Sequence, residues 1–200
     1  MLRYLLDAFS GPAAVFMYAL LGILAFAVAV FIERVVTLLR CRADATAVLE
    51  RSARAVAEGS APALGETPLE TVIAAGFAQA NSELGWDAML AAAVDAEQRV
   101  RRRIPYLAAV ASIATMVGLF GTVYGLIQAF GAMGDVAAAQ RAAALSSGSS
   151  TAMASTAFGL FVAIPSLAAH AMLDGQARAI LATIEATAGR VHVLRRQKAG

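Results

Sequence analysis

The amino-acid sequence predicts an all-α integral membrane protein with three transmembrane helices, of which helices 2 and 3 are long and extend into a cytoplasmic helical stalk. Two observations predict this class. The chain has 200 residues, of which 60% are hydrophobic and 15% are charged, whereas soluble domains are about 45–50% apolar and about 25% charged. It also contains three long segments without Asp, Glu, Lys or Arg, at 8–32, 104–134 and 142–173. A chain this short cannot bury so much apolar surface in a core, so lipid must cover part of it.

The lengths of these segments justify a transmembrane helix in each. They hold 25, 31 and 32 residues, and a helix needs about 20 mostly apolar residues to cross a membrane. The alternative, buried helices of a soluble bundle, would carry charge on an outer face. The first segment is longer than the apolar core of a signal peptide, and Glu33-Arg34 follows it without a small-x-small cleavage pattern. We therefore expect retained spans at 13–32, 105–130 and 147–173.

The positions of Lys and Arg predict the orientation of the chain. Nine arginines lie between spans 1 and 2 and five basic residues follow span 3, whereas only Arg3 precedes span 1 and only Arg141 separates spans 2 and 3. Basic residues accumulate on the cytoplasmic side of membrane proteins. We therefore expect four segments outside the membrane: a periplasmic N-terminus (1–12), a cytoplasmic helical region (33–104), a periplasmic loop (131–146) and a cytoplasmic C-terminal helix (174–200).

The cytoplasmic region is expected to form three helical segments. The first covers 40–58 and ends at the Gly-Ser-Ala-Pro that follows it. The second begins at 67–70, where Thr-Pro-Leu-Glu has the pattern of a capping box with proline in the first turn, and runs to about Asn81. A turn around Gly85 leads to the third, and because no clear breaker separates it from span 2, we favour one long helix. Pro105 either kinks that helix or occupies its first turn.

Composition also argues against several classes of function. The formal charge is +2, too small to suggest nucleic-acid binding. Cys41 is the only cysteine, so no internal disulfide forms, and no His/Cys/Asp/Glu cluster has metal-ligand spacing. No nucleophile elbow is present, and His170 is expected to be a packed or interface residue. We therefore expect no enzyme activity, no metal and no cofactor.

Polar side chains form a stripe on spans 2 and 3. Two interpretations follow from the residues alone. In one, the hydroxyls bond to the carbonyl four residues earlier and small residues let the helices pack closely. In the other, the stripes line a path for a cation or proton, and another chain supplies the carboxylate that the spans lack. On a helix the members of each stripe share an arc of about 80–100°: Ser112, Thr115 and Thr122 in span 2, and Ser155, Thr156, Ser166 and His170 in span 3, flanked by Ser149 and Thr151.

Both spans also carry recognisable motifs. Residues 118–125 read Gly-Leu-Phe-Gly-Thr-Val-Tyr-Gly, and residues 156–165 begin Thr-Ala-Phe-Gly-Leu and end Ala-Ile-Pro. These resemble the two hallmarks of the MotA/TolQ/ExbB family, Gly-Leu-Leu-Gly-Thr-Val-x-Gly and Thr-Ala-x-Gly-Leu…Ala-Ile-Pro. Glu33-Arg34 resembles the Glu-Arg pair of the family. Topology and length are similar to those of the short, ExbB-like members over nearly the whole chain.

The resemblance implies a function for the stripes. Family members form a ring of five subunits around a dimer of a single-span, ExbD-like or TolR-like partner, whose aspartate faces the hydroxyls of the ring. Ion movement is thought to rotate the dimer, and the work reaches the outer membrane through a TonB-like or TolA-like protein. The implied location is the bacterial inner membrane and the implied cargo is H+. Thr122 and Thr156 match the pore threonines, and the resemblance favours the ion path over packing for the stripes. The expected pore-lining residues are Thr122, Thr156, Thr115, Ser112, Thr151 and Ser155, and the expected packing residues are Gly118, Gly121, Gly125, Gly159 and Pro165.

The sequence departs from the family pattern at two positions. Thr115 replaces a proline, and Thr151 replaces a glutamate that is a candidate for the proton path. Hydroxyl oxygens also suit a hard cation, so Na+ stays open beside H+. A TolQ-like role and a non-conducting scaffold stay open as well, whereas a MotA-like role would need a fourth span.

Charged residues are expected at the inner membrane surface. Arginines 101–103 are expected to mark it, because anionic lipid attracts them. Glu33 and Arg34 either pair with charges on neighbouring helices or form a solvated surface pair. These expected cytoplasmic charged residues are Glu33, Arg34, Arg101, Arg102 and Arg103.

Overall fold

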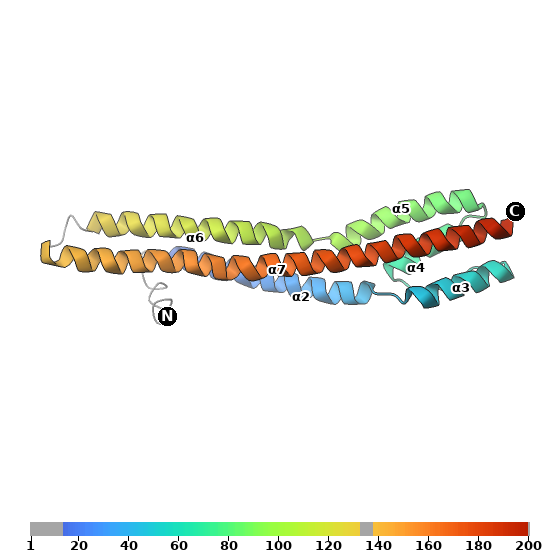
Figure 1. Cartoon of the computed structure of the whole chain (residues 1–200), viewed down its shortest axis with the longest axis horizontal. Coiled ribbons are helices and arrows are strands. Elements are labelled where there is room, and N and C mark those ends of the chain that lie inside the picture. Colours follow the sequence, from blue (N-terminus) through green and yellow to red (C-terminus); the bar gives the residue numbers. More distant parts are fainter. Residues whose placement is uncertain (1–13, 133–137, 200) are drawn as a thin grey trace. The chain divides into compact units, whose positions relative to one another are not determined.

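The computed structural model describes residues 14–132 and 138–199. Within these ranges the chain is helical and has no strand. Figure 1 shows the order of the helices along the chain. They are α2 (Ala14–Cys41), α3 (Ala45–Glu58), α4 (Pro68–Phe77), α5 (Ser82–Arg101), α6 (Ile104–Ala132) and α7 (Ala138–Ala199).

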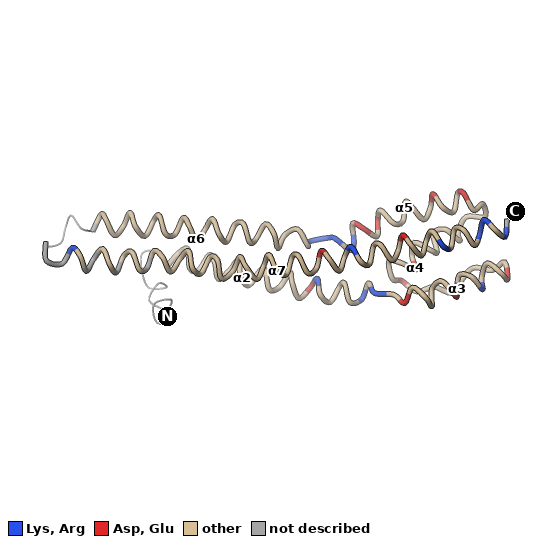
Figure 2. The backbone as a smooth tube through the Cα atoms, viewed as in Figure 1, with Lys and Arg blue, Asp and Glu red and all other residues tan. Residues whose placement is uncertain are grey.

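In the described part of the chain, three helical segments are long and apolar enough to cross a membrane. They lie within Ala14–Glu58, Ser82–Gly131 and Gly148–Lys198. Figure 2 shows α6 without charged residues, whereas Lys, Arg, Asp and Glu gather on α3, α5 and the C-terminal part of α7. The predicted class, an all-α protein with three membrane-spanning helices, is confirmed at this level.

The chain divides into two compact units where the charge-free segments begin and end. The first unit contains the described residues of Met1–Ile32 and Pro105–Ala171, and the second contains Glu33–Ile104 and the described residues of Met172–Gly200. Helices α2 and α7 each contribute to both units, because neither helix is interrupted at the division.

The first unit is held together by small side chains. Leu20 of α2 packs with Ala111 and Ala114 of α6 and with Val162 and Ala163 of α7. Many larger apolar side chains point outward, although Met17, Leu20 and Leu107 are buried. Small residues at the contacts allow the helices to approach closely. The outward-facing side chains include Met116, Phe120, Ile127, Phe161 and Ile164.

The second unit has an ordinary hydrophobic core. Its buried residues come from α3, α4, α5 and the C-terminal part of α7, and they include Val72, Ile73, Met89, Ile184 and Val191. Burying one such side chain stabilises a fold by about 1.5–3 kcal/mol, so this core suffices to position the short helices.

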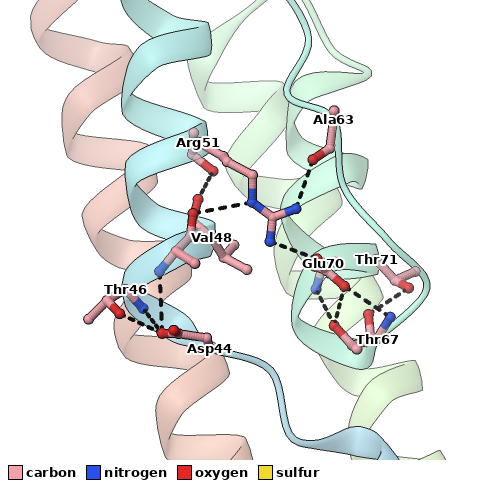
Figure 3. Close-up of polar contacts among 10 residues, drawn as sticks. Asp44, Thr46, Val48, Arg51, Ala63, Thr67, Glu70 and Thr71 are labelled. Carbon is pink, nitrogen blue, oxygen red and sulfur yellow. Dashed lines mark hydrogen bonds and ion pairs between the residues drawn. The ribbon is translucent and has the colours of Figure 1, made fainter.

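Side-chain caps set the helix ends of the second unit (Figure 3). The carboxylate of Asp44 accepts hydrogen bonds from the first backbone N–H groups of α3. Thr67 and Glu70 form the predicted capping box at the start of α4, with Pro68 in its first turn. Arg51 of α3 donates to Glu70 at 3.0 Å and to the carbonyl of Ala63 at 2.9 Å, and so fixes α4 and the preceding loop.

Three helix boundaries differ from the prediction because capping side chains start new helices at positions that the prediction did not include. The helix expected at 40–58 is interrupted after Cys41, because Asp44 caps a new helix. The next helix ends at Phe77 rather than near Asn81, because the Asn81 side chain accepts from the N–H of Glu83 at 2.8 Å and starts α5. The expected turn at Gly85 is therefore part of α5.

The expected continuous helix from the third segment into span 2 is wrong. Helix α5 ends at Arg101 and α6 begins at Ile104. Arg103 has a φ of 64°, the left-handed region that non-glycine residues rarely adopt. Pro105 explains the break, because it lacks an N–H and its ring would clash with the carbonyl of Arg101 in a continuous helix. It sits in the first turn of α6, one of the two positions considered for it.

The segment expected as a periplasmic loop (131–146) is also largely helical. Helix α6 continues to Ala132 and α7 starts at Ala138. Residues 133–137 lie outside the described part of the chain.

Candidate functional site

Two threonine hydroxyls meet where α6 and α7 cross in the first unit. Thr122 Oγ1 and Thr156 Oγ1 lie within hydrogen-bond distance of each other. Thr122 Oγ1 lies 2.9 Å from the carbonyl oxygen of Ala152 and 3.2 Å from that of Gly118, and Thr156 Oγ1 lies 3.3 Å from the latter. Both threonines are half-buried. Four oxygens from two helices therefore gather at one point of an apolar unit.

Glycines bring the two helices close enough for this contact. A Cβ added to Gly159 would lie 2.8 Å from the carbonyl oxygen of Ala114 and 3.0 Å from the Cα of Gly118. A Cβ added to Gly125 would lie 3.0 Å from the Cβ of Ala152. The backbones of α6 and α7 thus touch directly on both sides of the threonine pair, and larger residues there would separate the hydroxyls.

Ser155 lies beside Thr156 in sequence but faces the helix contact. Its side chain is 0% exposed, and its Oγ would be 2.1 Å from a Cβ built on Gly121. The Oγ has no hydrogen-bond partner in the described structure. Adjacent residues point about 100° apart on a helix, which explains why Thr156 stays half-open while Ser155 is enclosed. Ser155 therefore packs against Gly121 within this chain, and its expected pore-lining role stays a prediction.

The remaining stripe residues do not join the threonine pair. Ser112 and Thr115 are exposed, and each donates to the carbonyl four residues earlier, at 3.3 and 3.0 Å. Ser166 is buried and donates to Val162 at 2.7 Å, as hydroxyls in apolar helices commonly do. Pro165 and His170 are on accessible parts of α7. The side chain of Thr151 lies outside the described part of the chain.

Comparison with known proteins identifies the family. The family model for the MotA/TolQ/ExbB proton channel family matches residues 64–186, which are 123 of the 200 residues. The chain belongs to the MotA/TolQ/ExbB proton channel family. The matched range includes both pore-candidate threonines and all the glycines of the helix contact, so these positions belong to the part that family members share.

Individual relatives match a shorter part of the chain. The Tol-Pal system protein TolQ of Haemophilus influenzae is 39% identical over 83 residues, which are 42% of this chain and 36% of that protein. TolQ of Pseudomonas aeruginosa is 39% identical over 74 residues, 37% of this chain and 32% of that protein. The biopolymer transport protein ExbB of Neisseria gonorrhoeae is 33% identical over 99 residues, 48% of this chain and 44% of that protein. The chain therefore matches less than half the length of each of these relatives.

The Glu-Arg pair that resembles the family's lies at a joint of the second unit. Glu33 accepts from Arg103 at 2.7 and 2.6 Å and from Arg34 at 3.0 Å. Arg34 is 5% exposed and donates to the carbonyl of Arg102 at 2.8 Å. The hydrogen bond from Arg103 holds the pKa of Glu33 below its usual range, assisted by Arg34. The pair therefore bonds to the turn between α5 and α6, where Arg102 and Arg103 lie, and α2 thereby holds this break.

The three consecutive arginines at this break have different partners. Arg101 bonds to Glu97 and to Asp174 of α7, each at 3.1 Å. Burial opposes ionisation of Asp174, but hydrogen bonds from Arg178 and Arg101 hold its pKa below the usual range. The two ends of the three-arginine segment are thus neutralised by carboxylates, whereas Arg102 contributes its carbonyl to the joint and its side chain is exposed.

Sequence reasoning missed three contacts that shape the second unit. Asp174 was not identified as the partner of Arg101, and Arg195 and Lys198 were not identified as partners of helix ends. Arg195 donates to the carbonyl of Gly76 at the end of α4, and Lys198 to those at the end of α3. Basic residues near the C-terminal end of α7 were the available signal, but their targets lie more than 100 residues away.

Among the described residues no group of three or more His, Cys, Asp or Glu side chains is placed to hold a metal ion. The oxygens at the threonine pair are neutral hydroxyls and carbonyls. They can accept a proton donor or a hard cation, but they do not titrate near neutral pH.

Proposed function

We propose that the chain is a ring-forming ion-channel and stator subunit of an inner-membrane motor, which uses the proton motive force to energise a TonB-like protein for outer-membrane active transport. The observation that supports this most directly is the Thr122–Thr156 pair, held at a helix crossing of a proton channel family member. Polar groups placed inside an apolar membrane unit commonly mark an ion path. H+ is the proposed ion, and Na+ is the alternative because neutral oxygens also suit a hard cation.

The proposed partners supply the carboxylate that the crossing of α6 and α7 lacks. Residues 104–132 and 142–171 contain no Asp or Glu, and a threonine cannot release a proton near neutral pH. We propose that an ExbD-like or TolR-like single-span dimer, enclosed by a pentamer of this chain, supplies an aspartate to the threonine pair. The aspartate binds and releases the proton, while the threonines hold its protonated form by hydrogen bonds.

The test is proton conduction by membrane vesicles that contain the full chain and its single-span partner. Replacing either threonine by valine keeps the shape of the side chain and removes the hydroxyl. We expect conduction to fall by about 2- to 12-fold for at least one variant, because a hydrogen bond to the neutral, protonated carboxyl contributes about 0.5–1.5 kcal/mol. A non-conducting scaffold would instead keep its cellular function in both variants.

Thr183→Val is the matched control. Thr183 also lies on α7 and donates to the carbonyl four residues earlier at 2.9 Å, but it belongs to the second unit. Conduction is expected to be unchanged in this variant. If Thr122→Val and Thr156→Val behave like Thr183→Val at equal membrane levels, the proposed site is wrong.

A TolQ-like role in a Tol-Pal envelope system is the second candidate, because the relatives at 39% identity carry that name. Complementation separates the two roles. Restored TonB-dependent uptake in cells that lack their own ExbB supports the first role, and restored envelope integrity in cells that lack TolQ supports the second.

The proposed orientation places the N-terminus in the periplasm and the C-terminus in the cytoplasm. Cys41 is the only cysteine and is partly exposed at the end of α2. A membrane-impermeant maleimide should label it in inside-out vesicles and not in right-side-out vesicles. Because burial raises the pKa of the Cys41 thiol, labelling should be slow at neutral pH and faster in mildly alkaline buffer, where more thiolate forms.

A further inference from the structure

The charge of the second unit is unevenly distributed. Residues 33–42, 99–103 and 174–178, which adjoin the three charge-free segments, carry eight arginines and two carboxylates, a formal charge of +6. The remaining residues of this unit carry six basic and ten acidic side chains, a formal charge of −4. Figure 2 shows Lys and Arg at the end of α2 and between α5 and α6. We call residues 33–42, 99–103 and 174–178 the basic collar.

Ion pairs inside the basic collar neutralise only part of this charge. Both carboxylates are already shared between two guanidinium groups: Glu33 between Arg34 and Arg103, and Asp174 between Arg101 and Arg178. Burial raises the pKa of the Cys41 thiol, whereas the charges of Arg34 and Arg99 oppose this shift, so both cations lie near the end of α2. The collar therefore carries uncompensated positive charge directly beside the apolar segments.

Arg102 is a free cation on a fixed turn of this collar. Arg103 has a φ of 64°, which interrupts the helix, so the three consecutive arginines point in different directions. Arg101 and Arg103 bond to carboxylates, whereas the Arg102 side chain is exposed and forms no hydrogen bond or ion pair with any described residue. The buried Arg34 donates to the carbonyl of Arg102 at 2.8 Å and holds the turn. The turn thus presents Arg102 outward, with the partly exposed Arg103 beside it.

We infer that the turn at Arg102 and Arg103 binds the phosphate group of an anionic phospholipid. A guanidinium group matches two phosphate oxygens and stays charged at any physiological pH. The turn directly precedes the charge-free segment 104–134, so it lies at the depth of the lipid head groups when that segment spans the membrane. Anionic lipid attracts basic residues at this depth. The inference rests on the membrane location of the chain and is independent of the ion path.

The experiment measures the binding of phosphatidylglycerol to the full chain in an uncharged detergent, by native mass spectrometry. Phosphatidylcholine, whose phosphate is balanced by choline, serves as the lipid without net charge, and inorganic phosphate serves as the free anion. The parent should bind phosphatidylglycerol more tightly than phosphatidylcholine. Inorganic phosphate at the same concentration should not displace the lipid, because it lacks the acyl chains that pack against the apolar helices.

Arg102→Gln is the test variant, because no described residue bonds to the Arg102 side chain and the fold does not depend on it. Its affinity for phosphatidylglycerol should fall by about fivefold, the factor that corresponds to about 1 kcal/mol for one basic residue near anionic lipid. Arg102→Lys should recover most of the affinity, because it keeps the charge and loses only the second phosphate contact. Arg54→Gln is the matched control, since Arg54 is an exposed arginine of the same unit outside the collar. It should bind the lipid as the parent does.

A second measurement tests the same site in a bilayer. The melting temperature of the full chain in phosphatidylcholine nanodiscs should rise when phosphatidylglycerol is included, because a ligand that binds the folded state stabilises it. The rise should be smaller for Arg102→Gln than for Arg54→Gln.

The outcomes separate this inference from the proposed function. Equal affinities of Arg102→Gln and Arg54→Gln for phosphatidylglycerol, or no preference for this lipid over phosphatidylcholine, overturn it. Displacement of the lipid by an equal concentration of inorganic phosphate shows a site for free anions and overturns the assignment to lipid. None of these results bears on the Thr122–Thr156 contact, and a failure of the proposed ion conduction leaves the lipid site in place.

Discussion

The two units of the chain satisfy their polar groups in different ways. In the first unit, hydroxyls donate to main-chain carbonyls, as Thr115 does to Ala111 and Ser166 to Val162. In the second unit, charged side chains form ion pairs that tie a helix to a turn or to another helix, as Glu33 does with Arg103 and Arg51 with Glu70. The first pattern suits lipid surroundings, where separated charges are expensive, and the second suits water.

This difference indicates which kind of substitution should destabilise each unit most. Helices in lipid gain little from hydrophobic burial, so close contact between small residues must hold them together. Helices in water are held by a hydrophobic core, and polar contacts mainly set their ends and joints. Steric changes should therefore matter most in the first unit, and losses of charge should matter most in the second.

The largest effect is expected at the helix contact of the first unit. In Gly159→Ala the new Cβ would lie 2.8 Å from the carbonyl oxygen of Ala114, so the backbones of α6 and α7 must separate. Overpacking of this kind typically costs about 1–3 kcal/mol. The Thr122–Thr156 contact should also lengthen, and loss of that hydrogen bond would add about 0.5–1.5 kcal/mol. Unfolding by SDS, followed by loss of tertiary fluorescence or of helix, measures the free energy of unfolding.

Gly22→Ala is the control for this variant. Gly22 lies in the same unit, and a Cβ there would meet nothing within 4 Å. Alanine is favoured over glycine in a helix by about 0.5–1 kcal/mol, so this variant should be at least as stable as the parent. If Gly159→Ala is as stable as Gly22→Ala, close backbone contact does not hold the first unit together.

The next effect is expected at the joint between α5 and α6. Arg34→Met keeps most of the side-chain volume but removes the bonds to the carbonyl of Arg102 and to Glu33. Hydrogen bonds made by charged groups contribute about 1.5–3 kcal/mol, and the free energy of unfolding should fall by about that amount.

Arg54→Met is the matched variant, because Arg54 forms an exposed pair with Glu50 at 3.9 Å. Exposed pairs contribute about 0–1 kcal/mol, so equal effects of the two variants would contradict a structural role for the joint.

A smaller and pH-dependent effect is expected at the capping box of α4. The hydrogen bond from Thr67 holds the pKa of Glu70 below its usual range, although burial opposes this. A lowered pKa means that Glu70 stabilises the fold fully above the pKa of the unfolded chain, about 4.3, and that this contribution is lost as the pH falls through the lower value of the folded chain. Glu70→Ala should cost about 1 kcal/mol near pH 7, the usual value for a cap. The difference in free energy of unfolding between the parent and Glu70→Ala should shrink below about pH 4. A difference that grows as the pH falls would contradict a lowered pKa of Glu70 in the folded chain.

The sequence predicted those parts of the fold that depend on local or compositional signals. The capping box needs only Thr67 and Glu70, three residues apart, and the spans follow from the absence of charge. The break between α5 and α6 was missed because Pro105 is compatible with either a kink or a helix start. The contact that holds the break joins Glu33 to Arg103, 70 residues away.

The candidate site was predicted only in part, because its contacts also join residues that are distant in the sequence. A helical wheel places Ser155 and Thr156 in one polar arc. It cannot say which of them meets the neighbouring helix, because this depends on how α6 and α7 cross. In the structure Gly121 receives Ser155, and Thr156 is left beside Thr122.

The smallest effect is expected at the last turn of α7. Lys198 donates to the carbonyls of Val56 and Ala57, where α3 ends and its dipole is negative. A cation at a helix C-terminus stabilises it by about 0.3–1 kcal/mol, and salt weakens the effect. Lys198→Ala should lower the free energy of unfolding by this amount at low ionic strength and by less in about 1 M salt, where screening acts within about 3 Å. Arg196→Ala should have little effect in either buffer, because its pair with Glu83 is exposed and 4.0 Å long. Indistinguishable results for the two variants at low salt would show that Lys198 is a solvated charge and that α3 is held by its core contacts alone.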